Sequence, residues 1–275
     1  MVKIIYILMC HGPLESIFSL VDTILEADDS AEIIIHYDNQ SDPADYNLLL
    51  SKFNDFPRCH TLKSEERVNG YWGTFGLVQA VLNALRFLTS RSFNFTHCYL
   101  LSGSCFPIRP LSELKHFLYS NANKEFIECQ DTTWIFDGIR EDRYRYRHFF
   151  SKRRNPKLFR LCYLIQKKLL LRRNILDGFE IKFGSQWWCL SRATILRLID
   201  FIEERQGVVK FFRTVWIPDE CFFQTLVYHL CHHNNIANRS LTYYEFDSTG
   251  KPKCFTNCDI TDEMKTTHFF VRKYR

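Results

Sequence analysis

The sequence predicts an α/β fold with a doubly wound, mostly parallel sheet. Two isoleucine-rich runs, KIIYILMC (3–10) and AEIIIHYD (31–38), have the continuous apolar character of strands that are buried on both faces. Between them, PLESIFSLVDTILEA (13–27) carries apolar residues at helical spacing. A strand, a helix and a second strand in this order predict a βαβ unit with parallel strands.

The alternation continues along the chain. GLVQAVLNALRFLTS (76–90) is a second amphipathic helix, and HCYLLSGSCFPI (97–108) is a third apolar strand. The side of the helix that we expect to be buried carries Leu77, Val81, Leu85 and Leu88. Doubly wound sheets bind ligands at the carboxyl ends of their strands. Asp38 and the turn Ser102-Gly103-Ser104 follow such ends, so we expect a binding site there.

Composition and continuity predict a single domain over residues 1–275. The chain is 46% hydrophobic, enough for a substantial core, and no linker, repeat or low-complexity tract interrupts it. Aromatic residues make up 16% of the chain, which suits stacking surfaces for sugar rings or a nucleobase. No apolar run approaches the roughly twenty residues that a membrane-spanning helix needs.

The motifs that usually bind nucleotides in α/β proteins do not occur. No GxGxxG follows the first strand, no GxxxxGK[ST] occurs anywhere, and the chain has no Asp-x-Asp triplet that would hold a metal-bound diphosphate. A bound diphosphate would therefore need protein cations. The candidates near the carboxyl end are Lys251, Lys253, Arg272 and Lys273, and the alternative is that they form a solvated basic tail.

The stretch WIPDECFFQTL (216–226) places two carboxylates, Asp219 and Glu220, behind Pro218. One interpretation is a helix start, since proline and negative charge both suit a helix N-terminus. The other is a general base, because an acid beside aromatic residues and half out of water has a raised pKa. The stretch by itself leaves both open.

The eleven cysteines are odd in number and irregularly spaced, and MVKIIYILMC runs straight into a strand without a leader segment. We therefore expect reduced thiols and a cytoplasmic protein. Cys231, His232 and His233 form the tightest group of metal-ligating residue types, but paired CxxC spacing is missing. No metal site is expected.

Arginine and lysine gather between Arg143 and Asn174. Within segment 152–173, Leu158, Leu161, Ile165 and Leu169 recur at helical spacing, flanked by Arg160, Lys167, Lys168, Arg172 and Arg173. This pattern predicts peripheral contact with an anionic membrane. Two alternatives are a core-facing helix with a solvated basic face and a nucleic-acid-binding surface, although we expect no nucleic acid as a partner.

Five blocks in order resemble one known family. WGTFGLVQAVLNAL, YLLSGSCFPI, KFGSQWWCLSR, PDECFFQTL and FFVRK are similar to signatures of the core-2/I-branching N-acetylglucosaminyltransferases and peptide O-xylosyltransferases, glycosyltransferase family 14. The opening KIIYILMCHGPLESIFSLVDTIL is also similar to the family's amino-terminal block. The resemblance implies a GT-A type, Rossmann-like fold and an inverting, metal-independent transferase that uses a UDP-sugar donor.

The resemblance also implies roles for individual residues. Glu220 falls on the family's catalytic base, and Asp219, next to it, would cap or brace the turn on the acceptor side. Lys273 matches a C-terminal lysine that binds the diphosphate, with Lys253 or Lys251 as a second phosphate ligand and Arg272 adjacent. Asp38 would lie near the uridine, and Ser102 and Gly103 beside the nucleotide. The set assigned to the acceptor is Glu128, Arg143, Gly184, Ser185 and Trp187. For Glu128 and Arg143 the alternative is an ordinary ion pair.

One position departs from the family pattern. Cys105 stands where many members have an acid, which puts a donor assignment copied from those members in doubt. UDP-N-acetylglucosamine is the leading donor expected, with UDP-xylose, UDP-glucuronate or an inactive glycan-binding module as alternatives. Without the anchor and disulfides of eukaryotic members, the chain resembles a bacterial-type member. We expect it to act in surface polysaccharide or lipopolysaccharide assembly, peripherally on the inner membrane, with a glycan or lipid-linked saccharide as acceptor.

Overall fold

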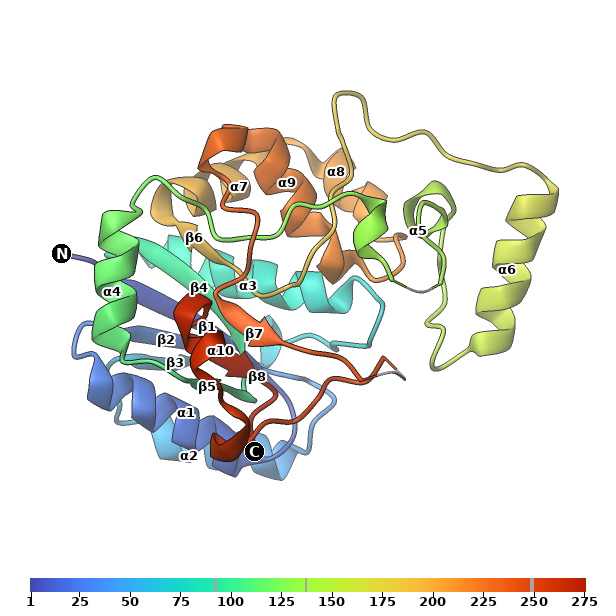
Figure 1. Cartoon of the computed structure of the whole chain (residues 1–275). Coiled ribbons are helices and arrows are strands. Elements are labelled where there is room, and N and C mark those ends of the chain that lie inside the picture. The colour runs from blue at the N-terminus through green and yellow to red at the C-terminus, as the bar shows by residue number, and fades with distance from the viewer. Residues whose placement is uncertain (92, 137, 248–249) are drawn as a thin grey trace.

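A five-stranded, mostly parallel sheet lies at the centre of the protein (Figure 1). The computed structural model describes residues 1–91, 93–136, 138–247 and 250–275. The strand order is β3-β2-β1-β4-β6, and only β6 runs antiparallel to its neighbour. The bounds are β1 Ile4–Cys10, β2 Glu32–Tyr37, β3 Cys59–Thr61, β4 His97–Ser102 and β6 Cys189–Ser191. The predicted fold class is confirmed, and β1, β2 and β4 form the centre of the sheet. The third strand, predicted over 97–108, ends at Ser102, and residues 105–107 belong to another sheet.

Helices cover both faces of this sheet (Figure 1). Alternate residues of β1 point to opposite faces, so Tyr6 packs with the helices on one side and Ile7 with those on the other. One side holds α1 Leu14–Ala27, α2 Pro43–Phe53 and α4 Leu111–Ser120. The other side holds α3 Gly76–Ser90, α7 Arg192–Glu204, α8 Gln206–Phe212 and α9 Phe222–Leu230.

The helices predicted over 13–27 and 76–90 are α1 and α3. In α3 the buried side is broader than predicted: Val78, Leu82 and Phe87 are buried, whereas Leu77 is only half-buried. The reason is that α3 packs both on the sheet and against α7. A second layer of helices therefore covers a side that the pattern alone would leave to solvent.

A second, three-stranded sheet lies beside the first and was not predicted. Its order is β5-β8-β7, with β5 Cys105–Pro107, β7 Thr242–Tyr244 and β8 Phe270–Arg272. The middle strand β8 comes from the end of the described chain, antiparallel to β5 and parallel to β7. Three-residue strands give almost no alternation to recognise in a sequence. Through β8 the residues around Arg272 and Lys273 are drawn into the body of the protein.

Short elements connect these parts. The remaining helices are α5 Asp142–Arg145, α6 Pro156–Lys168 and α10 Asp262–Thr267. The 3-10 turns are η1 Ser64–Glu66, η2 Thr132–Trp134, η3 Pro218–Glu220, η4 His233–Asn235 and η5 Asn257–Asp259. The helix start predicted at Pro218 is thus a separate 3-10 turn, and α9 begins after it at Phe222.

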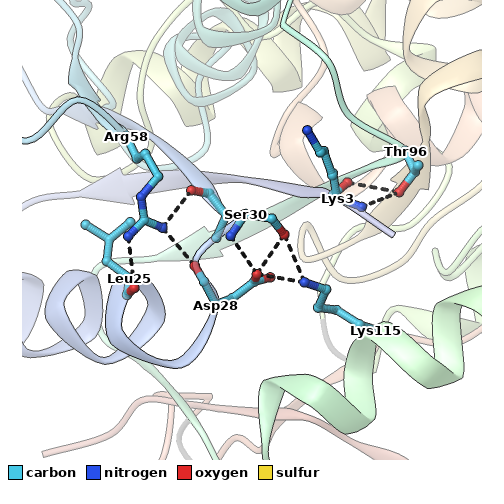
Figure 2. A network of polar contacts seen from close by, with 8 residues as sticks. Lys3, Leu25, Asp28, Ser30, Arg58, Thr96 and Lys115 are labelled. Atoms are coloured by element: carbon cyan, nitrogen blue, oxygen red, sulfur yellow. Dashed lines mark hydrogen bonds and ion pairs between the residues drawn. The ribbon is translucent and has the colours of Figure 1, made fainter. Parts of the chain in front are cut away.

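Polar contacts fasten the amino ends of the strands (Figure 2). Lys115 of α4 donates to Asp28 Oδ1 at 2.7 Å and to Ser30 Oγ at 2.9 Å, just before β2 begins. Arg58 donates to the Asp28 carbonyl oxygen at 2.8 Å from the chain that leads into β3. Lys3 and Thr96, which precede β1 and β4, exchange hydrogen bonds of 3.0 and 2.9 Å. Side-chain contacts therefore tie the amino ends of these strands together.

Helix α6 projects away from the central sheet (Figure 1). Its buried residues are Phe159 and Gln166, whereas the predicted apolar row is exposed, with Leu161 at 54% and Leu169 at 61%. The alternative of a core-facing helix is therefore wrong. No helix in the described part of the chain is long and apolar enough to span a membrane.

Candidate active site

Two of the predicted donor residues meet at the carboxyl end of β1. The amide of Asp38, just after β2, donates to the Cys10 carbonyl oxygen at 2.8 Å. The amide of Gly103, just after β4, donates to the Met9 carbonyl oxygen at 3.0 Å. A side chain on Gly103 would come within 2.9 Å of Cys10 Sγ, so glycine is required for this close approach. The expected meeting of strand ends is therefore present.

The Asp38 carboxylate is held from two sides. Its Oδ1 accepts from the Gln40 amide at 2.8 Å, and its Oδ2 accepts from the Gly70 amide at 3.0 Å. Arg67 donates to the carbonyl oxygens of Tyr37 and Asp38 at 2.7 and 2.9 Å. The loop that follows β2 is thereby fixed with a negative charge at the edge of the sheet.

Ser102 and Cys105 form a small buried cluster. The Ser102 amide donates to Cys105 Sγ at 3.3 Å, and the Ser102 hydroxyl lies 3.3 Å from the same sulfur. Burial raises the pKa of Cys105, while Ser102 and Arg272 oppose the rise. The thiol at this departure from the family pattern is thus a neutral, packed group close to the Arg272 cation.

The C-terminal cations reach the same edge because β8 is paired on both sides. The Tyr274 amide donates to the Ser104 carbonyl oxygen at 2.8 Å, which fastens the segment to the turn after β4. Burial and the neighbouring Arg272 charge lower the pKa of Lys273. An ammonium group held next to another cation and partly out of water gains most from a bound anion such as a phosphate.

The two upstream lysines differ from Lys273. Lys253 lies beside it in the backbone, since the Lys273 amide donates to the Lys253 carbonyl oxygen at 3.3 Å, but the Lys253 ammonium forms an ion pair with Glu245. That pairing raises the pKa of Lys253. Lys251 is exposed on the loop that leads into this segment. Lys273 is therefore the better-placed of these lysines.

His11 was missed by the sequence analysis. It directly follows β1, as Asp38 directly follows β2, and that shared position is the signal that could have found it. Partial loss of solvent, with the charges of Lys273 and Arg272, lowers the pKa of His11, and Asp38 opposes this. His11 thus lies in the electrostatic neighbourhood of both Asp38 and Lys273.

The turn that carries the two acids is rigidly placed. Ile217 has φ 54°, a left-handed conformation that is rare for a β-branched residue. Its amide donates to the Gly73 carbonyl oxygen at 3.2 Å, and its buried side chain packs with Trp216 and Phe159. The Gly184 amide donates to the Glu220 carbonyl oxygen at 3.0 Å. Contacts on both sides hold this conformation and set the direction of Glu220.

Glu220 forms an ion pair with Arg143. Nη1 of Arg143 lies 2.7 Å from Glu220 Oε2, and the arginine side chain is 7% exposed against 26% for the glutamate. Burial raises the pKa of Glu220, and Arg143 opposes the rise. Arg143 also donates to the Ile139 carbonyl oxygen at 3.1 Å. The carboxylate is thus oriented by Arg143, with one edge still open to solvent.

Asp219 is more deeply buried than Glu220. Loss of solvent, with the adjacent Glu220 charge, raises the pKa of Asp219 to about 7, although Arg143 and Arg272 pull it down. Its Oδ1 is buried without a hydrogen-bond partner in the described part of the chain. Asp219 caps neither η3 nor α9, because Ile217 and Cys221 are their N-cap residues. The expectation of a cap is therefore wrong, and the alternative that Asp219 braces the turn stays a prediction.

Glu128 and its neighbours form the floor beside this turn. The Tyr244 hydroxyl donates to both Glu128 carboxylate oxygens at 3.0 and 2.9 Å, and the Ser185 amide donates to Oε2 at 2.8 Å. A Cβ atom on Gly184 would come within 2.5 Å of Glu128 Cβ. The alternative that Glu128 and Arg143 make ordinary ion pairs holds for Arg143, whose partner is Glu220. The described hydrogen-bond partners of Glu128 are neutral groups. Of these partners, Tyr244 was missed by the sequence analysis.

Arg272 connects the donor side with the acids. Its guanidinium lies 4.8 Å from the ring centre of the buried Trp187. It is close enough to Asp219 and Cys105 for their charges to affect its pKa, which burial lowers. Its Nε is buried with no hydrogen-bond partner among the described residues. An unpaired buried donor between the strand ends and the acid turn fits an anionic ligand.

Aromatic and basic side chains form a wall next to the Glu220–Arg143 pair. Arg143 lies 5.3 Å from the ring centre of Trp216, which meets Trp72 edge to face at 6.1 Å. Lys152, Arg153 and Arg154 cover Trp216, Trp72 and Tyr71 at 5.0, 4.1 and 4.2 Å. We call these three aromatic residues the aromatic wall. Trp216 is buried, whereas Trp72 and Tyr71 are half-buried and are the rings that could stack on a sugar.

No three histidine, cysteine, aspartate or glutamate side chains converge as metal ligands in the described ranges. All eleven cysteines are free thiols. Cys231 is half-buried, whereas Cys254 and Cys258 are exposed. The chemically distinctive parts of the site are therefore two acids, two arginines and a lysine, brought together from η3, α5 and the segment around β8.

Comparison with known proteins identifies the family. A sequence model described as Core-2/I-Branching enzyme matches residues 4–267. The chain belongs to this family. It is a family of glycosyltransferases, and the central sheet with its flanking helices is the GT-A type fold that the resemblance implied.

Two curated relatives support the same class. The protein is 25% identical over 210 residues to Xylosyltransferase oxt of Drosophila melanogaster, covering 75% of this chain and 22% of the relative. It is 26% identical over 203 residues to Xylosyltransferase oxt of Drosophila pseudoobscura pseudoobscura, covering 72% and 21%. The chain therefore spans about a fifth of the length of these relatives.

Proposed function

We propose that this member of the Core-2/I-Branching enzyme family transfers a sugar from a UDP-sugar to a glycan hydroxyl, with inversion at the anomeric carbon. The observation that carries the proposal is Glu220, a half-buried carboxylate oriented by Arg143 with a pKa raised by burial. Cations lie nearby on the side of the strand ends, since the Arg272 charge reaches Asp219. A single displacement needs a base for the acceptor proton and a cationic site for the leaving diphosphate, and here the two lie on neighbouring elements.

These groups account for each bond and for the proton in the transfer. The acceptor oxygen forms a bond to the anomeric carbon while its proton passes to Glu220. The bond from that carbon to the β-phosphate oxygen breaks, and its electron pair leaves with UDP. Lys273 and Arg272 stabilise the negative charge that grows there. Arg143 orients Glu220 before the transfer, and the half-buried Tyr71 and Trp72 contact the acceptor sugar.

The leading donor remains UDP-N-acetylglucosamine, and UDP-xylose is supported by the xylosyltransferase names of the relatives. UDP-glucuronate is the third candidate. UDP release measured over a panel of UDP-sugars identifies the donor. Absence of UDP release with every donor, together with binding to glycans, would favour the inactive glycan-binding alternative. A bacterial origin, a cytoplasmic location and a role in surface polysaccharide assembly stay predictions.

Glu220→Gln tests the assignment of the base. Glutamine keeps the shape of the side chain but not its basicity, so we expect UDP release to fall about a hundred- to ten-thousandfold while UDP still binds. Lys273→Ala should weaken UDP binding as well as turnover. The control Glu204→Gln changes an exposed glutamate at the end of α7 and should behave like wild type. Retention of a third or more of the activity by Glu220→Gln would show that another group is the base.

Metal independence is tested separately. Because Lys273 and Arg272 are proposed to take the place of a divalent cation, transfer should continue in excess EDTA at an unchanged rate. Calorimetry should likewise give the same UDP affinity with and without the chelator. Loss of transfer on chelation, restored by manganese, would contradict this part of the proposal.

A further inference from the structure

The segment 152–173, which we call the α6 arm, exposes a row of large apolar side chains. Leu158, Leu161, Ile165 and Leu169 share one helix face by spacing and are 43 to 61% exposed. The chain then continues with two further leucines, of which Leu170 is 82% exposed. A contiguous exposed apolar surface of this kind marks an interaction site.

The orientation of the helix is fixed by its opposite face. Phe159 packs on Trp216 and stacks with His148 at a centroid distance of 5.0 Å. Tyr163 donates a hydrogen bond to Asp142. Gln166 accepts from the Arg147 amide at 2.9 Å and donates to the Arg147 carbonyl oxygen at 2.8 Å. The polar and aromatic residues therefore face the protein, and the leucines face outward.

The arm is also strongly positive. It contains no aspartate or glutamate, and its cations are Lys152, Arg153, Arg154, Lys157, Arg160, Lys167, Lys168, Arg172 and Arg173. Some of them have partners in the protein: Arg173 donates to the carbonyl oxygens of Tyr144 and Phe211, and Arg172 pairs with Glu141 at 3.0 Å. Within the described ranges, Lys157, Arg160 and Lys168 form no ion pair.

We propose that the α6 arm is a contact surface for an anionic lipid bilayer, with the leucines in the acyl boundary and Lys157, Arg160 and Lys168 on the headgroups. A second copy of the chain would bring two acid-free, positive arms together, which is electrostatically unfavourable. A bilayer with acidic headgroups satisfies both the apolar row and the cations. The contact stands independently of the proposed transfer.

The arm is physically continuous with the candidate active site. Trp216 packs on Phe159 of the arm and also lies beside Arg143, which holds Glu220. Lys152, Arg153 and Arg154 are occupied in covering the aromatic wall, so they are removed from the predicted set of lipid contacts. A bilayer bound by the arm would therefore lie next to the acceptor side of the site.

Co-sedimentation with phosphatidylcholine vesicles, with and without phosphatidylglycerol, tests the proposal. The wild-type protein should bind only the vesicles that contain phosphatidylglycerol, and salt should weaken binding. Lys157→Glu, Arg160→Glu and Lys168→Glu together should weaken it about a hundredfold or more, since each cation contributes about fivefold. Leu161→Ser with Ile165→Ser should weaken it by about tenfold for each residue, and both are exposed enough to leave the fold intact.

The matched control reverses the same number of charges elsewhere. Lys63, Arg192 and Lys210 are exposed outside the arm, and their change to glutamate should leave most of the binding in place. If this control lost as much vesicle binding as the arm variant, the effect would depend on net charge alone, and the proposal would be overturned. So would a wild-type protein that ignores phosphatidylglycerol vesicles at low salt. A dimer in sedimentation that disappears with Leu161→Ser and Ile165→Ser would overturn it in favour of a second copy.

Discussion

Asp219 and Glu220 are neighbours in the chain, yet their surroundings differ. Glu220 has an arginine within 2.7 Å and an edge open to solvent, whereas Asp219 is buried with an unpaired oxygen. Burial therefore raises the pKa of Asp219 to about 7, which lets the pair carry one proton near neutral pH. In the proposed mechanism the proton rests on the buried acid, and Glu220 acts as the base.

The raised pKa of Asp219 predicts how the free energy of unfolding depends on pH. In the unfolded chain this acid loses its proton near its usual value of 3.8, but in the folded protein it keeps the proton to about 7. Between these values the folded state binds more protons, so its stability falls as pH rises. Relative to Asp219→Asn, the wild-type free energy of unfolding should drop by up to about 1.4 kcal/mol per pH unit between pH 4 and 7.

Urea denaturation at several pH values measures this difference directly. Asp177→Asn is a suitable control, because Asp177 is an exposed aspartate outside the site and should leave the pH dependence as in wild type. Parallel curves for wild type and Asp219→Asn would mean that Asp219 is already ionised in the folded protein.

The sequence predicted the positions of these acids but not their partners. Asp38 and Gly103 were placed correctly at strand ends because strand ends follow from periodicity alone. The pairing of Glu220 with Arg143 depends on the position of α5, 77 residues away in the chain, and no local pattern contains that information. Tyr244 was missed for the same reason, since it becomes part of the site only through tertiary contacts. His11 could have been found from its position directly after β1.

At the scale of elements, long helices and buried strands were predictable and short elements were not. The 13–27 and 76–90 helices have several turns of periodic apolar residues, whereas β5, β7 and β8 have three residues each. For α6 the spacing of apolar residues predicted the helix correctly, but it did not show which face of the helix is buried. The aromatic residue Phe159 and the amide Gln166 face inward there, which reverses the usual rule that leucines do.

Leu170 carries a prediction of its own. It follows the C-cap of α6 with φ 54°, where glycine is the favoured residue, and its side chain is 82% exposed. Leu170→Gly should therefore keep or raise the free energy of unfolding by up to about 1 kcal/mol, since left-handed strain is relieved. The same change should weaken vesicle binding.

Leu170→Ala separates the two effects. Alanine retains the left-handed strain but removes the apolar side chain, so this variant should lose vesicle binding without gaining stability. Thermal denaturation and co-sedimentation of the three proteins provide the comparison. A Leu170→Gly protein that is clearly less stable than wild type would mean that the leucine packs on the protein rather than on lipid.

At the scale of the whole molecule, the amino and carboxyl ends of the central strands have different roles. The amino ends of the strands are joined by Asp28, Ser30, Arg58 and Lys115 (Figure 2), and the carboxyl ends carry the candidate site. Asp28 has a fully buried side chain, so its pairing with Lys115 supports the fold and lies outside the chemistry.

Lys115→Ala tests this division. Removing the ammonium leaves a buried carboxylate with the Ser30 donors alone, and we expect the free energy of unfolding to fall by about 1–3 kcal/mol. UDP affinity measured well below the melting temperature should not change. Lys63→Ala, at an exposed position, is the control and should change neither quantity. A parallel loss of UDP affinity in Lys115→Ala would show that the two ends are coupled.

The α6 arm lies between Arg143 and Gly184 in the chain but outside the central sheet in space. Its outward face makes no contribution to the core, so mutations there are not restrained by the need to fold. Under the proposed bilayer contact, the residues that set the location of the protein and those that carry its chemistry can evolve at different rates. Exchanging the outward residues of the arm between family members should redirect an enzyme to another surface and leave its reaction as it was.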